Sequence, residues 1–176
     1  VERTNTPFAR FYAMVTIGRI IIPGILVTVA WLFVASPNIG IANWLLEPLT
    51  GLRATFNIYS FWGMVWVSSL DSIPLCFLLV SASLQAMDPR LEDASTMTGA
   101  GTWRTFSKVT LPLIWPAIVA ICILMFISAS ENFEVPLMLG SRAQFPVYAT
   151  EVYYNTARQP TNWGLSSTYS TALLFV

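Results

Sequence analysis

Three long apolar runs constrain the fold of this chain more than any other feature of its sequence. The first, 20–36, is uncharged; the second, from about residue 58 to residue 87, contains one charge, Asp71; the third, 109–130, is uncharged again. A helix needs about 20 predominantly apolar residues to cross roughly 30 Å of hydrocarbon. We therefore predict that each run forms a transmembrane helix.

The composition argues against a soluble protein with buried helices. Hydrophobic residues make up 55% of the 176 residues and charged residues only 10%, whereas soluble domains average about 25% charged residues. Three runs that are apolar on every face would leave no amphipathic helices to cover them. We predict an all-α fold, a polytopic transmembrane helical bundle formed by the whole chain, 1–176.

A fourth apolar stretch begins near Leu165 and is cut off at Val176, and the chain starts abruptly at Val1. Neither end resembles a natural terminus, so a leader peptide cannot be judged from them. We expect the chain to be part of a longer protein.

Charge and side-chain chemistry exclude several classes of function. The net charge is zero and no cluster of Lys and Arg occurs, so nucleic acid is not expected as a partner. The absence of histidine removes the commonest metal ligand and general base. Cys76 and Cys122 lie in separate apolar runs, so neither a disulfide nor a zinc site is expected. We predict no catalytic residue and no metal site.

The distribution of Lys and Arg predicts the orientation, because cytoplasmic segments carry an excess of positive charge. The segments between the apolar runs alternate between the two sides of the membrane. The segments on one side carry five Lys or Arg residues, Arg3, Arg10, Arg90, Arg104 and Lys108, and those on the other side carry three, Arg53, Arg142 and Arg158. The N-terminus and the segment 88–110 are therefore expected in the cytoplasm. The loop after the first run is then external, and its amphipathic piece around 44–49 is predicted to lie along the outer interface, where Trp is enriched.

The polar segment between the second and third runs has clear helix signals. Asp88 followed by Pro89 is typical of a helix start, with Asp as the N-cap residue and Pro in the first turn. We predict a helix over 90–98, ended by Gly99 and Gly101 as C-cap glycines end helices.

Thr102 is placed to cap a second short helix over 103–108, and Pro112 falls in the first turn of the third run, where proline is tolerated. One face of this second helix gathers Trp103, Arg104 and Phe106. Exposed aromatics with arginine are typical of docking surfaces. From the residues alone, an ordinary cytoplasmic loop with its tryptophan among lipid headgroups is an equal alternative.

The spacing within this segment resembles the EAA loop of the membrane subunits of ABC importers. The sequence runs Asp93-Ala94-Ser95, three residues, Gly99, nine residues, Val109, one residue, Leu111-Pro112. The family pattern is Glu-Ala-Ala, three residues, Gly, nine residues, a branched apolar residue, one residue, Leu-Pro. Asp93 stands where the family has Glu, and its shorter side chain changes the reach of the carboxylate.

The resemblance implies a coupling loop, 88–110, that docks into a groove of a cytoplasmic ATP-binding subunit. The implied docking element comprises Asp93, Ala94, Gly99, Trp103, Arg104, Leu111 and Pro112. ATP and Mg²⁺ would be bound by that partner, because this chain contains no G-x-x-x-x-G-K-[ST] motif. The chain itself is therefore not expected to be an enzyme.

Further stretches resemble permeases for ferric iron and related cargo such as thiamine or polyamines. They are ASPNIGIANWLLEPLTG, FNIYSFWGMVWV and SENFEVPLMLG, and they are most similar to the first half of the two-repeat iron type. The resemblance implies a multi-pass subunit of the bacterial inner membrane, surrounded by lipid. It also implies an external substrate-binding protein and a second permease half, in the same chain or as a homodimer.

Asp71 is a candidate for the translocation path. A carboxylate facing lipid is unfavourable, so it should face protein or a water-filled cavity. Ser68, Ser69 and Ser72 are placed to solvate it, and Pro74 to bend the helix. A structural carboxylate at an interhelical contact and a path-lining group both stay open.

Glu131, Phe133, Glu134 and Pro136 follow the third run. Pro136 and the nearby Gly140 predict a non-helical or re-entrant stretch, which is tolerated only where protein or a cavity surrounds it. The two carboxylates and the phenyl ring are candidates for an outer gate passed by a cationic cargo; two solvated acids of an outer loop are the alternative. Without histidine, a tight transition-metal site is not expected.

Two other classes of protein share the apolar pattern. An ion-gradient-driven carrier would use Asp71 or Glu131 as a proton site and would transport without ATP. A membrane-embedded enzyme would need a nucleophile–base pair or a cluster of metal ligands, and the sequence shows neither. We therefore favour the permease subunit of an ATP-driven importer, with ferric iron as the expected cargo.

Overall fold

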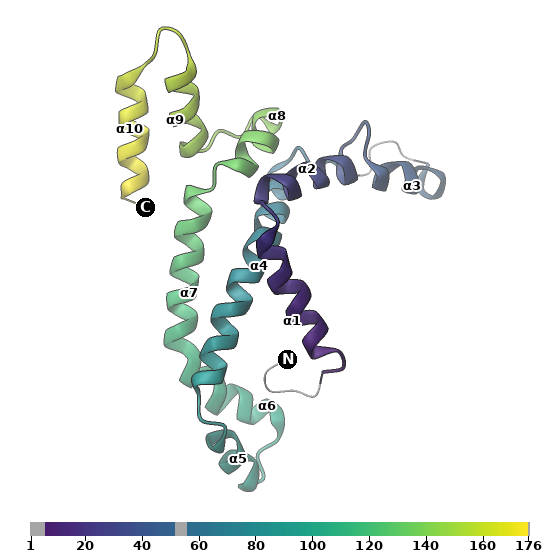
Figure 1. Ribbon diagram of the computed structural model, residues 1–176, viewed down its shortest axis with the longest axis vertical. Helices are drawn as coiled ribbons and strands as arrows, with labels where there is room; N and C mark the ends of the chain where they lie inside the picture. Colours follow the sequence, from purple (N-terminus) through teal and green to yellow (C-terminus); the bar gives the residue numbers. More distant parts are fainter. Residues whose placement is uncertain (1–5, 52–55, 176) are drawn as a thin grey trace. The chain divides into compact units, whose positions relative to one another are not determined.

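The computed structural model describes residues 6–51 and 56–175, and within them the chain is all-α, with no strand. The prediction of a polytopic α-helical membrane protein is confirmed. The elements are α1 (Ala9–Gly18), η1 (Arg19–Ile21), α2 (Gly24–Ala35), α3 (Ile41–Thr50), α4 (Phe61–Ala86), α5 (Arg90–Met97), α6 (Thr102–Thr105), η2 (Phe106–Thr110), α7 (Leu111–Glu131), η3 (Pro136–Gly140), α8 (Ser141–Ala143), α9 (Tyr148–Ala157) and α10 (Trp163–Leu174). The α-helices are labelled in Figure 1. Arg3 and Arg53, two of the charges that predict the orientation, lie outside the described residues.

Two helices are long and apolar enough to cross a membrane. One is α4, with 26 residues, and the other runs without interruption from Thr102 to Glu131. At 1.5 Å per residue α4 alone is about 39 Å long, which exceeds the roughly 30 Å of hydrocarbon. The second and third apolar runs therefore form helices of the predicted kind, each long and apolar enough to span a membrane, and α4 continues through Pro74 as one helix.

The prediction of one continuous helix over 20–36 is wrong. The helical segment that ends with η1 stops at Ile21, and α2 begins at Gly24, so this region qualifies as a span only as a broken pair. Pro23 has an extended backbone (ψ 137°) and precedes the first residue of α2. Proline cannot donate the backbone hydrogen bond that would continue the helix, which explains the break.

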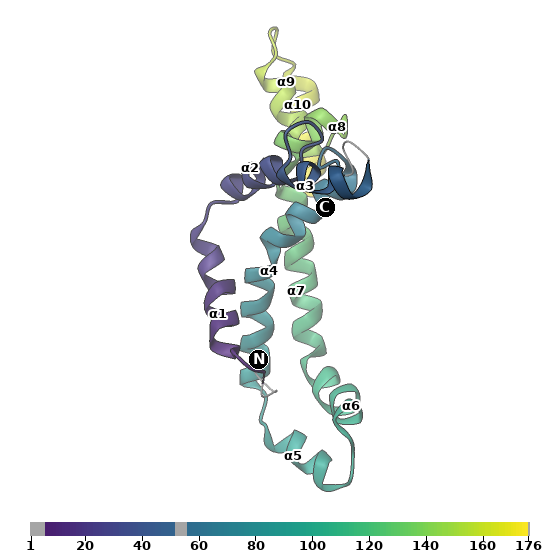
Figure 2. The same cartoon turned by 90° about the vertical axis from the view of Figure 1, so that its right-hand side faces the viewer.

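The fourth apolar stretch forms α10, a helix of 12 residues. It pairs with α9, and Figures 1 and 2 both show the two helices side by side. Asn162 begins α10, because its side-chain oxygen accepts from the backbone N–H of Leu165 at 3.1 Å.

The described residues divide into two compact units, one made of 6–21 and 73–126, the other of 22–51, 56–72 and 127–175. The second unit contains a cluster of buried apolar residues from the end of α2, from the start of α4 and the residues before it, and from η3 and the residue before it: Ala35, Ile58, Met64, Val67, Val135 and Leu139. The first unit contains the segment between the two spans, whose short helices α5 and α6 pack on each other and on η2.

The predicted non-helical or re-entrant stretch after the third run is helical at Pro136–Gly140, so its non-helical form is wrong there, and its re-entrant form stays a prediction. The backbone leaves helical geometry only at Asn132 and Phe133, and Pro136–Gly140 form a π-helical turn. The Asn132 side chain accepts a hydrogen bond from the backbone N–H of Val135 at 3.2 Å and so restarts the helix. Proline is compatible with this position because it lies in the first turn after the break.

Candidate functional site

The first helix of the coupling loop, 88–110, lies close to its predicted bounds, as Arg90–Met97, but Pro89 and not Asp88 occupies the N-cap position, and Thr98 is the C-cap residue. The Asp88 carboxylate accepts from the backbone N–H of Arg90 at 3.0 Å, and α5 starts there. At the other end Gly99 has a φ of +81°, a conformation that favours glycine. Gly101 is different, because its extended backbone precedes α6 and does not terminate α5.

The second helix departs from the prediction. Thr102 does not cap it; Gly101 occupies the N-cap position and Thr102 is the first helical residue. The helix also does not stop at Lys108 but continues through η2 into α7. In η2 the backbone N–H of Leu111 donates to the carbonyl of Phe106, five residues back. This wider π-helical turn ends immediately before Leu111 and Pro112.

Two side-chain hydrogen bonds hold α5 against the start of the long helix. The hydroxyl of Thr110 donates to a carboxylate oxygen of Glu92 at 2.6 Å, and the hydroxyls of Ser95 and Thr105 lie 3.0 Å apart. Thr105 and Thr110 are buried. We call these two contacts the coupling-loop lock. The sequence did not reveal them, because no local pattern links Glu92 to a threonine 18 residues away.

The lock leaves an apolar surface exposed. Trp103 is 78% and Met97 is 89% exposed, and the Trp103 ring lies 5.7 Å from that of Phe106, centroid to centroid. Asp93, Ala94 and Arg104 are exposed as well, as are the neighbouring charges Arg90 and Lys108; Leu111 is half-buried and Pro112 exposed. Apolar patches with a polar and charged rim are typical of protein–protein contact sites.

In the second unit, two of the path candidates converge on a glycine. A Cβ atom built on Gly24 would lie 2.9 Å from a carboxylate oxygen of Glu134 and 3.4 Å from both carboxylate oxygens of Asp71. The two carboxylates therefore approach the same point at the first residue of α2. Gly24 was not among the predicted residues, although its position after Pro23 was a sequence signal for a break.

The serines near Asp71 have other hydrogen-bond acceptors. The Ser69 hydroxyl donates to the carbonyl of Val65 at 2.6 Å, and the Ser72 hydroxyl donates to the carbonyl of Ser68 at 2.9 Å. Their protons therefore stabilise the backbone of α4 and are not directed at Asp71. The expectation that Ser69 and Ser72 solvate Asp71 as donors is wrong.

The remaining gate candidates do not share one cluster with this pair. Glu131 is the exposed last residue of α7, and Phe133 packs against Tyr153 of α9 with ring centroids 5.4 Å apart. Pro136 opens η3. Within residues 6–51 and 56–175 no group of three or more His, Cys, Asp or Glu side chains is arranged to hold a metal ion.

Comparison with known proteins places these features in a family. The family model described as "Binding-protein-dependent transport system inner membrane component" matches residues 7–176. The ferric transport system permease protein FbpB of Actinobacillus pleuropneumoniae is 29% identical over 129 residues, which are 73% of this chain and 18% of that protein. The molybdenum transport system permease protein ModB of Escherichia coli K12 is 32% identical over 83 residues, 47% of this chain and 36% of that protein.

A solved structure has the same fold. It is that of a bacterial alginate ABC transporter in complex with alginate pentasaccharide-bound periplasmic protein, with a TM-score of 0.77 and 18% identity. The match covers 99% of this chain and 65% of that one. The chain thus spans less than two thirds of the length of each of these relatives.

Proposed function

Because the chain belongs to the family of binding-protein-dependent transport system inner membrane components, we propose that it forms the translocation path of an ATP-driven importer. The observation that carries this proposal is the coupling loop: two short helices, locked together and exposing an aromatic patch, at one end of a 30-residue helix.

In the proposed mechanism, cytoplasmic ATP-binding subunits receive the exposed patch around Trp103. Closure of these subunits on ATP displaces the loop, and α6, η2 and α7 transmit the displacement because they form one uninterrupted helix. A substrate-binding protein delivers cargo on the opposite side, and a second permease half completes the path. The chain lies in the bacterial inner membrane and leaves ATP hydrolysis, with ATP and Mg²⁺, to its partner.

We propose ferric iron as the cargo. The FbpB relative supports it, and so do the Asp71 and Glu134 carboxylates, which converge at Gly24 and suit a cationic cargo. The molybdenum relative makes an oxyanion the second candidate. Uptake into proteoliposomes, with binding proteins loaded with Fe³⁺ or with molybdate, separates the two. If ferric iron is the cargo, Asp71→Asn and Glu134→Gln lower iron uptake, whereas Glu131→Gln changes it little, because the Asp71 and Glu134 carboxylates approach Gly24 and Glu131 is the last residue of α7.

Capture of the ATP-binding subunit tests the coupling role. Trp103→Ala removes the centre of the exposed patch, and Gly99→Val forces a β-branched residue into a φ of +81°. Each variant is expected to lower ATPase capture at least tenfold while the protein still inserts into membranes. Trp163→Ala is the matched control, because Trp163 is similarly exposed (70%) but belongs to α10.

Wild-type capture by both coupling variants contradicts the docking assignment. Uptake that persists in liposomes without ATP and follows an ion gradient contradicts the importer itself, because it indicates the ion-gradient-driven carrier.

A further inference from the structure

The short helix α3 is fixed in its rotation by one buried side chain. Asn43 is only 6% exposed, and its amide nitrogen donates to the carbonyls of Ser36 at 2.9 Å and Phe56 at 2.8 Å. Its amide oxygen accepts from the backbone N–H of Phe56 at 2.7 Å. All of these groups lie in one compact unit, so Asn43 determines which face of α3 points toward the protein.

The opposite face of α3 is apolar and exposed. Ile41 is 56%, Trp44 72%, Leu45 56% and Leu49 81% exposed. Their spacing of three, four and eight residues from Ile41 places them on one side of a helix. The face carries no charge, because the one charged residue of α3, Glu47, follows Asn43 by four residues and shares its side.

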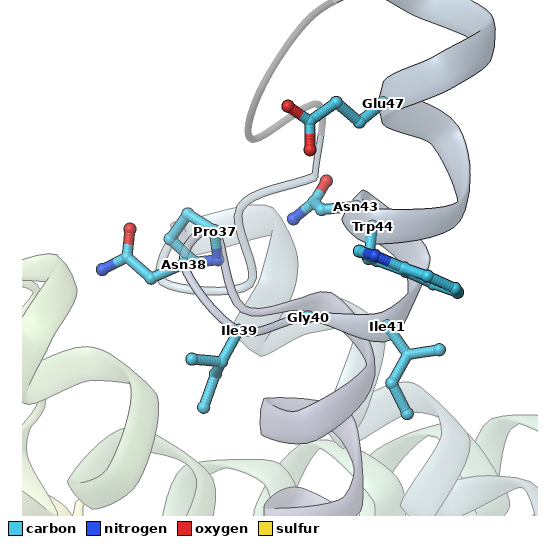
Figure 3. A pocket seen from close by; sticks show the side chains of 8 residues that line it. All are labelled: Pro37, Asn38, Ile39, Gly40, Ile41, Asn43, Trp44 and Glu47. Carbon is cyan, nitrogen blue, oxygen red and sulfur yellow. The ribbon is translucent and has the colours of Figure 1, made fainter.

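Figure 3 shows this division around a hollow of about 380 Å³. Asn43 and Glu47 project to one side of α3, while Ile41 and the indole of Trp44 project away from them. The polar side chains of α3 are thus directed toward its own connecting loop, and the apolar side chains face away from that loop, toward the surroundings of the protein.

The ends of this connection are tied to the start of a membrane span. The backbone N–H of Ile58 donates to the carbonyl of Ala35 at 3.1 Å, and α4 begins three residues later at Phe61. Tryptophans gather at this level: Trp31, Trp62 and Trp66 line one apolar pocket of about 510 Å³, and the Trp31 and Trp66 rings are 5.8 Å apart. Tryptophan is enriched where a membrane meets water. The anchor points of α3 therefore lie near the membrane surface.

We propose that α3 is a membrane-interface anchor, with Ile41, Trp44, Leu45 and Leu49 inserted among the lipid headgroups and upper acyl chains. The distribution of Lys and Arg along the sequence predicts that it lies on the outer side of the membrane. An amphipathic helix with an uncharged apolar face and a tryptophan lies in the interface plane. The occupant is lipid because the face offers no charged group to a protein partner and its connection is tied to a cluster of tryptophans at the start of α4. This inference is independent of the proposed cargo and coupling; it requires only that α4 spans the membrane.

Site-directed spin labelling of the full-length transporter in proteoliposomes tests the anchor. In a background without Cys76 and Cys122, labels at Leu45→Cys and Leu49→Cys are expected to collide more often with oxygen than with a water-soluble nickel chelate. A label at Asn38→Cys, an exposed polar position of the same connection, is expected to show the reverse preference. An aqueous preference at positions 45 and 49 equal to that at 38 overturns the proposal.

Other occupants give different results. If the face binds the substrate-binding protein, the labels are aqueous in its absence and become shielded when it is added. If the face binds a second copy of the chain, the labels broaden each other's spectra. Either result overturns the lipid assignment.

A charge introduced on the face provides an independent readout. Leu49→Asp is expected to lower the oxygen-to-nickel accessibility ratio at position 45 at least threefold, because a carboxylate is excluded from the interface more strongly than leucine. Leu49→Ile is the matched control and keeps the ratio. An unchanged ratio in Leu49→Asp contradicts insertion even if both variants fold and insert normally.

Discussion

Two connecting segments flank α4 in the sequence: the one that contains α3 and the coupling loop. They are built in the same way, although we propose that one contacts lipid and the other a protein partner. Each is a short helical segment held by buried side-chain hydrogen bonds, from Asn43 in one and from the coupling-loop lock in the other. Each exposes a tryptophan, Trp44 or Trp103. The difference is charge: the α3 face has none, whereas charges surround the patch of the coupling loop, Arg90, Asp93, Arg104 and Lys108. Charged rims suit protein partners and uncharged faces suit lipid.

The connections also differ in what they are tied to. Asn43 bonds to backbone groups of its own connection, so α3 is fixed locally. Glu92 bonds to Thr110, which belongs to the uninterrupted helix that includes α7. A force on α5 therefore reaches α7 through a side-chain contact, whereas the connection of α3 is tied to the start of α4 by a backbone hydrogen bond, from Ile58 to Ala35.

The largest effect is expected from Asn43→Ala. It removes three hydrogen bonds, and unsatisfied buried groups each cost about 1–3 kcal/mol. Local opening of the 36–51 and 56–58 segments should become easier by about 3 kcal/mol, which is roughly a 100-fold faster amide exchange where opening limits exchange. Hydrogen exchange followed by mass spectrometry measures it, with Asn38→Ala as the exposed control. If amide exchange in α5 accelerates as much as in the α3 segment, the two connecting segments do not open independently, and the comparison fails.

A smaller effect is expected from breaking the lock between Glu92 and Thr110. Hydrogen bonds to charged groups contribute about 1.5–3 kcal/mol, so Thr110→Val should accelerate exchange in α5 roughly tenfold and lower the cargo transported per ATP hydrolysed. Thr96→Val is the control, because the Thr96 hydroxyl donates only to the carbonyl of Asp93 within α5.

A double-mutant cycle with Glu92→Gln isolates the contact, because its coupling energy appears only if the two side chains interact. Additive effects of the two substitutions on exchange in α5 contradict the lock.

Sequence reasoning succeeded where local chemistry decides the structure. The lengths of two apolar runs predicted α4 and α7. The glycine at position 99 predicted the end of α5, and the structure gives Gly99 a φ of +81°, which favours glycine. It failed at Pro112, which was expected in the first turn of a span but lies inside the uninterrupted helix Thr102–Glu131. A proline alone does not distinguish these two positions.

The arrangement of the candidate site was less predictable than the helices. Asp71 and Glu134 were selected separately, as a charge in an apolar run and as an acid beside a predicted break. Their approach to Gly24 depends on contacts between residues far apart in the sequence. The same holds for Asn43, whose partners lie 7 and 13 residues away. No periodicity encodes such contacts, so only the fold reveals them.

The smallest expected effect separates the two faces by their response to salt. Between about 0.1 M and 1 M salt the screening length falls from roughly 10 Å to 3 Å. Capture of the ATP-binding subunit should therefore weaken by a few-fold, because Arg104 and its neighbours are exposed. The slope of affinity against ionic strength should flatten in Arg104→Gln. The oxygen-to-nickel ratio at position 45 should stay constant over the same range, because burial of an uncharged face in the interface does not depend on screened charges. Equal salt dependence at both sites would mean that the two connections do not differ in the chemistry of their partners.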